Sequence, residues 1–301
     1  MEDAHYNSVM QNGHHDIFMS WIDRLPKNLL SQNVSLMLTQ AYSLIFMRQT
    51  DAALDLLKNI ALRTPKAAGL PDVTGVEAAE LMIKAITMDF QNDVEIGFLA
   101  CEEWQQKKFD SEPVIQVSIL CAIAYKALFT NEFKEGERAC EEAYNIAVGE
   151  ASDYGLSWCE AIRAILLIYQ GRYQEAYSIA SQALESNRAN LGERHYTSLI
   201  LQIVVGMADF YLGNIPACVQ KLGSIIEFIQ DYSPIMLLQS SVTLLARIAA
   251  YQGRIEKARY WLELGENCAR KWKLGRLSLE LKAQRILIEL QFGDVELARH
   301  L

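Results

Sequence analysis

The chain is poor in turn-forming residues. Its 301 residues include only 16 glycines and 6 prolines. β-Sandwiches and β-barrels need such residues roughly every 8–12 positions, so this scarcity argues against both. Half of the chain (51%) is apolar, which excludes a disordered chain, because disordered sequences bury too little surface to offset chain entropy. We therefore expect a large buried area that is shared among many helices.

Positive charge and long apolar runs are also scarce. The 28 lysines and arginines stand against 37 acidic residues, and the formal net charge of −9 disfavours direct binding to a phosphate backbone. The polar, acidic N-terminus is unlike a secretory signal. The densest apolar runs, at 164–169 and 199–208, are much shorter than the roughly 18–20 residues of a membrane span. We expect a cytoplasmic protein that makes no membrane contact.

The sequence contains no recognised catalytic or metal-binding motif. Neither G-x-S-x-G nor D-D-x-x-D occurs. His14 and His15 would point to different faces of a helix, and no third ligand stands at metal-ligand spacing, so we expect a solvated pair and no metal site. The 6 cysteines are spread singly with no C-x-x-C, as is typical of reduced core thiols. We therefore expect a protein that is not an enzyme.

A sequence repeat organises most of the chain. The segment Tyr169-Gln-Gly171-Arg recurs as Tyr251-Gln-Gly253-Arg, and each copy is followed by an alanine five residues after the glycine. Weaker copies extend the series in both directions, at spacings of 39–44 residues. The repeat places inter-helix turns at positions 48, 92, 131, 171, 213, 253 and 293.

Small residues flank these turns on both sides, which predicts a helical hairpin at each turn. Two small residues let antiparallel helices approach closely where they cross. The small residues five positions after each turn are Ala53, Gly97, Gly136, Ala176, Cys218, Ala258 and Ala298. The small residues that stand seven positions before each turn are Ala41, Ala85, Ala124, Ala164, Gly206 and Ala246, with Ile286 as the exception. Aromatic rings two positions before the first six turns are expected to fill the wedge between successive hairpins.

The resulting fold class is all-α, a right-handed α-solenoid of about seven hairpins. A single hairpin cannot bury its own apolar face, so neighbours must stack into a continuous core. The array is expected to cover residues 31–301, and residues 1–30 form a lead-in helix or the tail of a preceding domain. The second helix of each hairpin is expected to run for roughly 15–20 residues after its turn. The predicted first helices are 31–47, 72–91, 113–130, 152–170, 193–212, 234–252 and 275–292.

This pattern of small residues, Gly or Asn turn and aromatic or branched residue resembles the tetratricopeptide repeat (TPR), with longer helices. A second, narrower resemblance begins at Trp21-Ile-Asp-Arg-Leu25-Pro26 and continues through Ala41-Tyr42-Ser-Leu44. It is similar to the start of the superhelical sensor region of large ATP-binding LuxR-type (MalT-type) activators, a bacterial family. The resemblance implies an inducer-sensing array that lies between a nucleotide-binding switch domain and a LuxR-type helix-turn-helix.

Two features depart from the whole family protein. No G-x-x-x-x-G-K-[ST] occurs, so no cofactor is expected in this chain and ATP only in a missing upstream domain. No basic DNA-reading segment follows the array, so DNA is expected as a partner only through a missing C-terminal domain. The chain ends a few residues into the last second helix. We therefore expect an array that is truncated in its seventh hairpin and belongs to a longer polypeptide.

The first helices of TPR-like arrays line a concave face, and this predicts a binding groove. Its candidate residues are Tyr125, Trp158, Ile203, Met207, Phe210 and Arg247. The rings offer an apolar platform, and Arg247 offers a directional donor for a carboxylate or phosphate. Further positions in the same columns include Tyr42, Asp89, Ile165, Thr243 and Glu280. The alternative is that tighter superhelical winding buries these side chains between adjacent first helices.

Three functions follow from these patterns. The favoured one is a sensor module of a LuxR-type activator, which binds a small-molecule effector and controls an attached ATPase. The second is a free-standing adaptor that binds a peptide or protein in its groove, and self-association is possible for either. A hydrolase or transferase with an unrecognised site is the least favoured.

Overall fold

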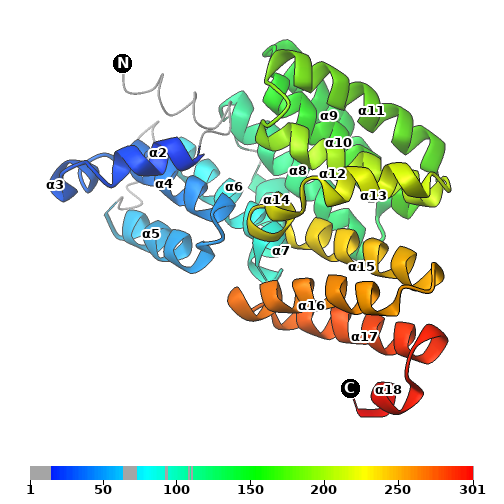
Figure 1. The fold of residues 1–301 in the computed structure, drawn as a ribbon. Coiled ribbons are helices and arrows are strands. Elements are labelled where there is room, and N and C mark those ends of the chain that lie inside the picture. The colour runs from blue at the N-terminus through cyan, green and yellow to red at the C-terminus, as the bar shows by residue number, and fades with distance from the viewer. Residues whose placement is uncertain (1–14, 64–72, 92–93, 108, 110, 301) are drawn as a thin grey trace.

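The computed structural model describes residues 15–63, 73–91, 94–107, 109 and 111–300. These residues form 17 helices and no strand (Figure 1). Two short helices, α2 (His15–Ile22) and α3 (Lys27–Leu30), precede the repeats. Phe18 and Ile22 of α2 are buried in a small apolar cluster that also includes Leu36. The N-terminal segment that the structure describes therefore packs onto the array.

Seven helical hairpins follow, and they confirm the predicted α-solenoid. Every predicted first helix is observed to within three residues at each end. The first helices are α4 (Val34–Phe46), α6 (Val73–Phe90), α8 (Pro113–Thr130), α10 (Asp153–Tyr169), α12 (Tyr196–Tyr211), α15 (Ile235–Tyr251) and α17 (Gly275–Phe292). Their second helices are α5 (Thr50–Arg63), α7 (Glu95–Lys107), α9 (Phe133–Gly149), α11 (Tyr173–Asn190), α13 (Ile215–Gly223) with α14 (Ile226–Asp231), α16 (Ile255–Lys271) and α18 (Val295–His300).

The backbone conformation explains which residue types occupy the predicted turn positions. Five of its members adopt left-handed backbone angles, with φ from 57° to 82°: Arg48, Asn131, Gly171, Gly213 and Gly253. Such a residue ends a helix and reverses the chain, and glycine and asparagine adopt it at the least steric cost. Position 92 lies outside the described residues. Gly293 has a φ of −119°, so this glycine is required for a different reason, given below.

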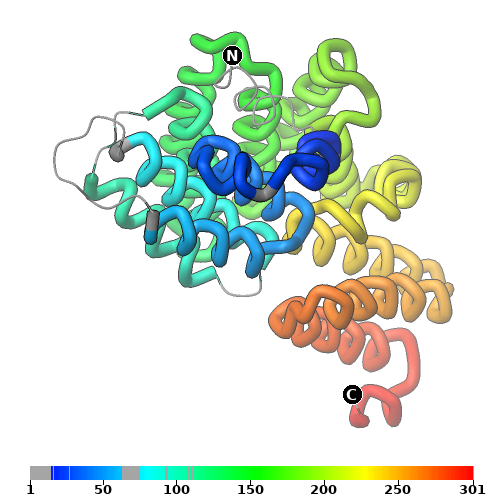
Figure 2. The backbone as a smooth tube through the Cα atoms, turned by 90° about the vertical axis from the view of Figure 1, so that its left-hand side faces the viewer, coloured from blue at the N-terminus to red at the C-terminus, as the bar shows by residue number. Residues whose placement is uncertain are grey.

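The small-residue columns lie where the two helices of each hairpin cross. Ala53, Ala176 and Ala258 are fully buried. A Cβ atom at Gly97 would lie 2.9 Å from the Cβ atom of Met88, which is closer than real side chains come. The hairpins then stack, and their apolar residues form one continuous core from Met37 to Ile288. The array curves as it stacks (Figures 1 and 2).

The aromatic column is buried only in the first half of the array. Phe46 and Phe90 are buried, whereas Tyr169, Tyr211 and Tyr251 are 50%, 42% and 65% exposed. The expectation that all these rings fill the wedge between hairpins is therefore wrong for the later repeats. There the ring lies at the edge of the array, as Tyr251 does against Phe292 with ring centres 4.9 Å apart. The rest of its surface faces solvent.

The second helix of the fifth hairpin is broken, contrary to the expected continuous helix. α13 ends at Gly223 and α14 begins at Ile226. The break leaves the carbonyl oxygen of Lys221 available to a side chain. The buried Gln202 on α12 donates to that carbonyl at 2.9 Å and to Ser224 Oγ at 3.0 Å. A buried amide on the first helix thus satisfies the polar groups that the break exposes.

Helix α8 is longer and more apolar than the uninterrupted runs suggested. Its 18 residues have a mean hydropathy of 1.6, enough in length and composition alone for a membrane span. However, 61% of the helix is buried inside the fold. It packs against α6, α9 and α10, so the solenoid itself accounts for its apolar character.

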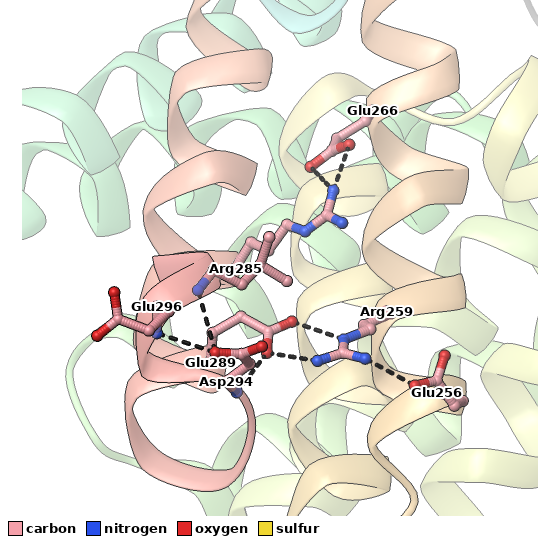
Figure 3. Close-up of polar contacts among 8 residues, drawn as sticks. Glu256, Arg259, Glu266, Arg285, Glu289, Asp294 and Glu296 are labelled. Atoms are coloured by element: carbon pink, nitrogen blue, oxygen red, sulfur yellow. Dashed lines mark hydrogen bonds and ion pairs between the residues drawn. The ribbon is translucent and has the colours of Figure 1, made fainter. Parts of the chain in front are cut away.

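An ion-pair network joins α16, α17 and α18 (Figure 3). Glu289 on α17 is fully buried and forms a two-pronged pair with Arg259 on α16, at 2.7 and 2.8 Å. The same carboxylate accepts the backbone N–H of Asp294 at 3.0 Å, just before α18. A Cβ atom at Gly293 would collide with this carboxylate, which explains the glycine in the seventh turn. Arg259, as the main hydrogen-bond partner, lowers the pKa of Glu289.

The helix crossing gives the first testable prediction. Ala176→Leu should overpack the crossing of α10 and α11 and lower the free energy of unfolding by about 1–3 kcal/mol. Gln174→Leu, at an exposed position of the same helix, should cost much less. Urea unfolding followed by circular dichroism measures both. Equal effects of the two leucines would contradict the assignment of the small-residue column.

The buried carboxylate gives a prediction about pH. Glu289→Gln should lower the free energy of unfolding at pH 7 by about 1.5–3 kcal/mol, because it removes a charge-assisted hydrogen-bond pair. The pKa of Glu289 is lower in the folded state than its ordinary 4.5. The stabilisation is therefore complete above the ordinary pKa and is lost as pH falls through the folded value.

Urea unfolding at several pH values tests this directly. The difference between wild type and Glu289→Gln should shrink steadily below about pH 4.5. Glu263→Gln, at an exposed position on α16, serves as the control and should differ little from wild type at any pH. A difference for Glu289→Gln that does not change with pH would show that the carboxylate charge is not what stabilises this junction.

Candidate functional site

The solenoid closes on itself through Arg48. This residue sits in the turn of the first hairpin, yet its Nε atom donates to the carbonyl oxygen of Asp231 at 3.3 Å and its Nη2 atom to that of Ser233. Its guanidinium also lies 6.0 Å from the centre of the Trp272 ring. Arg48 is only 7% exposed, and this burial lowers its pKa. The first hairpin is therefore fastened to the connection between the fifth and sixth.

Aromatic rings from distant hairpins meet beside this contact. Phe46 lies 5.3 Å from Phe90, 6.3 Å from Trp158 and 5.6 Å from Tyr196, measured between ring centres. Tyr196 continues the series to Phe228 of α14 at 5.3 Å. We call Phe46, Phe90, Trp158, Tyr196 and Phe228 the axial aromatic cluster. It fills the axis of the superhelix where an open array would have a groove.

A cavity of about 170 Å³ lies next to this cluster, among the first helices of the first four hairpins. Its walls are mainly apolar and aromatic, with a few polar groups. The described residues that line it are Tyr42, Phe46, Ile86, Asp89, Glu112, Pro113, Val114, Val117, Ser118, Cys121, Ala122, Ala147, Glu150, Ser152, Tyr154, Gly155, Trp158 and Ile162. A concave apolar site with a small number of polar groups is the usual form of a small-molecule site.

Asp89 is the unusual group in this cavity. It lies one residue before the end of α6, and its Oδ1 atom is buried with no hydrogen-bond partner. Burial raises the pKa of Asp89 well above its ordinary value. Unpartnered buried carboxylates are costly and are therefore rare. The wall of the cavity therefore contains a carboxylate oxygen that has no hydrogen-bond partner.

Two more acidic residues line the same cavity, on other helices. Glu112 caps the N-terminus of α8 and Glu150 follows the end of α9, and both are exposed. Together with Pro113 and Ser152 they form the solvent side of the cavity. Asp89 lies deeper, near Tyr125 in the middle of α8, whose pKa is raised first by burial and then by the proximity of Asp89. The cavity therefore has acidic groups both at its mouth and inside.

The structure places the predicted groove residues in different environments. Trp158 is half-buried and lines the cavity. Tyr125, Ile203 and Met207 are buried, at 4%, 0% and 2% exposed, because the tight superhelix packs their helices together. They therefore do not face an open groove. Their contact with a ligand remains a prediction.

Phe210 and Arg247 lie apart from the cavity and form a pair of their own. The Arg247 guanidinium is 5.6 Å from the centre of the Phe210 ring, and both side chains are partly buried. Tyr125 lines a smaller second cavity of about 120 Å³, between α6, α8 and α10 on one side and α15 and α17 on the other. The predicted residues are thus divided among four places, namely two cavities, the packed core and the Phe210–Arg247 pair, and the structure does not bring all six together.

Sequence reasoning missed part of the cavity wall. Ser118 and Cys121 occupy columns thirteen and ten residues before their turn, and Trp158 shares the first of these. The repeat register was therefore a signal that could have found them. Glu112, Glu150 and Tyr154 belong to helix ends outside those columns. Only the mutual placement of three hairpins reveals them.

His15 also differs from expectation. It is 5% exposed and stacks on Phe46 with ring centres 4.2 Å apart, so the expected solvated pair is wrong for His15. His14 lies outside the described residues. All six cysteines are free and buried, as predicted. Within the described part of the chain no group of three or more His, Cys, Asp or Glu side chains could hold a metal ion.

The repeated hairpins, their small-residue crossings and their continuous core define a TPR-like helical-repeat protein. No family model matches the chain. It is 22% identical over 222 residues to the HTH-type transcriptional regulator AlkS of Ectopseudomonas oleovorans and 21% identical over 222 residues to AlkS of Pseudomonas putida. Each match covers 74% of this chain and 25% of the relative, so the matched part spans a quarter of those regulators.

A solved structure shares the fold. The crystal structure of a Rap protein complexed with competence and sporulation factor superposes with a TM-score of 0.59. The match covers 89% of this chain and 85% of the Rap chain at 16% sequence identity. The likeness is therefore one of helical-repeat architecture over nearly the whole length.

The closing contact generates a prediction of its own. Arg48→Met should lower the free energy of unfolding by about 1.5–3 kcal/mol, because it removes charge-assisted hydrogen bonds to two backbone carbonyl groups, of which that of Ser233 is buried. It should also speed amide hydrogen exchange in α4 and α14 more than in α9 and α11, since the first hairpin loses its fastening. Hydrogen exchange with mass spectrometry measures this. Arg194→Met, at an exposed arginine, is the control. If Arg48→Met and Arg194→Met show equal hydrogen-exchange patterns, closure through Arg48 is contradicted.

Proposed function

We propose that the chain is the ligand-sensing repeat module of a LuxR-type, MalT-like transcriptional regulator, and that the cavity is its small-effector site. One observation carries the proposal: the cavity is lined by the carboxylate of Asp89, whose Oδ1 atom is buried with no hydrogen-bond partner in the described chain. A ligand group would satisfy it. The distant similarity to AlkS and the Trp21–Pro26 segment support the regulatory context.

In this proposal the chain binds an effector, transmits that binding to attached domains, and catalyses no reaction. ATP hydrolysis and DNA binding belong to domains outside the chain, and the module needs no cofactor of its own. Coupling requires an effector whose affinity differs between two arrangements of the array. The cavity touches the first four hairpins, while Arg48 fastens the first to the fifth and sixth. A ligand that changes the packing around the cavity would thereby change the fit at this contact.

A second candidate is an adaptor that binds a peptide or protein. The fold neighbour supports it, because that Rap protein was solved with its competence and sporulation factor bound. The small cavity favours the sensor instead: about 170 Å³ suits a small molecule and is too little for a length of peptide.

A thermal-shift screen of small metabolites tests the sensor proposal. Binding at a hundredfold excess over Kd should stabilise the chain by about 2.7 kcal/mol, which raises its Tm by several degrees. Ser118→Phe, which places a ring in the cavity, should abolish the shift. Ser178→Phe, at an exposed site on α11, should keep it. The proposal fails if no compound stabilises the wild type, or if every hit also stabilises Ser118→Phe.

A further inference from the structure

The charges that line the cavity define which ligands it can take. Its described lining residues include three carboxylates, those of Asp89, Glu112 and Glu150, and no lysine, arginine or histidine. Desolvation is what raises the pKa of Asp89, and its buried Oδ1 atom has no hydrogen-bond partner in the described part of the chain. An anionic ligand would meet repulsion at the mouth and again inside. A cationic ligand would supply the positive charge that the described lining residues lack.

The aromatic walls favour the same ligand charge. Phe46 and Trp158 meet at an interplanar angle of 59°, and Tyr42 lies 5.0 Å from Phe46, so the rings form an angled corner. The face of an aromatic ring carries partial negative charge and attracts a cation within about 6 Å of its centre. Rings beside a buried carboxylate therefore combine two attractions for a positive group. They also supply apolar contact for the body of the ligand.

The volume limits the size of that body. A cavity of about 150 Å³ with apolar walls is large enough to bind benzene. The cavity here, at about 170 Å³, has room for one ring or branched alkyl group with a short polar arm. Nucleotides and peptides exceed this space.

We propose that the cavity binds a small organic cation, an amine or quaternary ammonium with an apolar body, whose charged group contacts Asp89 while its body packs against Phe46 and Trp158. This assignment rests on the proposed effector-binding function and names the chemical class of the effector. In the free protein, burial without a charged partner raises the pKa of Asp89. A cation supplies that charged partner.

Isothermal titration with three compounds of nearly equal shape tests the charge preference. The probes are 2-phenylethylammonium, 2-phenylethanol and phenylacetate, which are cationic, neutral and anionic. The wild type should bind the ammonium at least tenfold more tightly than the alcohol, and the carboxylate more weakly still. Benzyltrimethylammonium, which cannot donate a hydrogen bond, should also bind, because the carboxylate and the rings attract its charge.

Asp89→Asn is the decisive variant, because it keeps the shape of the side chain and removes its charge. It should weaken ammonium binding at least tenfold and leave the weak binding of the alcohol unchanged. It should also fold at least as stably as the wild type, since it removes an unpartnered buried carboxyl group. Asp51→Asn, at an exposed site on α5, should bind all probes as the wild type does.

The outcomes separate this assignment from the broader function. Absence of ammonium binding, equal binding of ammonium and alcohol, or ammonium affinity unchanged in Asp89→Asn would each overturn the cation assignment. If the alcohol still binds and Ser118→Phe removes that binding, the cavity remains an effector site for a neutral ligand that accepts a hydrogen bond from Asp89. If the metabolite screen also finds no ligand for the cavity, the sensor function fails as well.

Discussion

The close crossing of two helices at every turn is the constraint on which the rest of the structure depends. Ala53, Ala176 and Ala258 are fully buried at these crossings, and at Gly97 even a methyl group would collide with the partner helix. Close crossing makes each hairpin a flat unit with two apolar faces. Such units stack into one continuous core, and the stack accumulates curvature from one hairpin to the next. Closure at Arg48 and the cavity beside it are consequences of that curvature.

Much of the fold could be predicted from the sequence because it is local. A left-handed residue such as Gly171 or Gly253 and a small residue five positions later specify one hairpin, and repetition then specifies the array. The fifth hairpin shows where local reasoning fails. Gly223 is a local signal for the break between α13 and α14, but the group that satisfies the exposed carbonyl, Gln202, lies on the preceding helix. A buried glutamine in an apolar run was a second available signal.

The candidate site was less predictable, because it depends on how distant hairpins meet. Asp89 and Trp158 stood in the expected concave columns, and both line the cavity. Ile203 and Met207 stood in the same columns and are buried. The difference arises from the closure of the superhelix, which a repeat register cannot encode. Arg48 itself occupies an ordinary turn position, and its partners lie 183 and 185 residues away.

The same closure changes the mechanics of the array. Both ends of an open solenoid are free to move, so a local distortion of the packing decreases over the neighbouring repeats. Arg48 joins the first hairpin to the connection between the fifth and sixth hairpins, so the two ends of this part of the array are held together. Any widening at the cavity must then be taken up elsewhere in this part of the array. The second helix of the fifth hairpin, which lies next to this contact, is interrupted between Gly223 and Ile226, so its backbone lacks a continuous series of helical hydrogen bonds there. A change in packing at the cavity would be accommodated most readily at such an interruption.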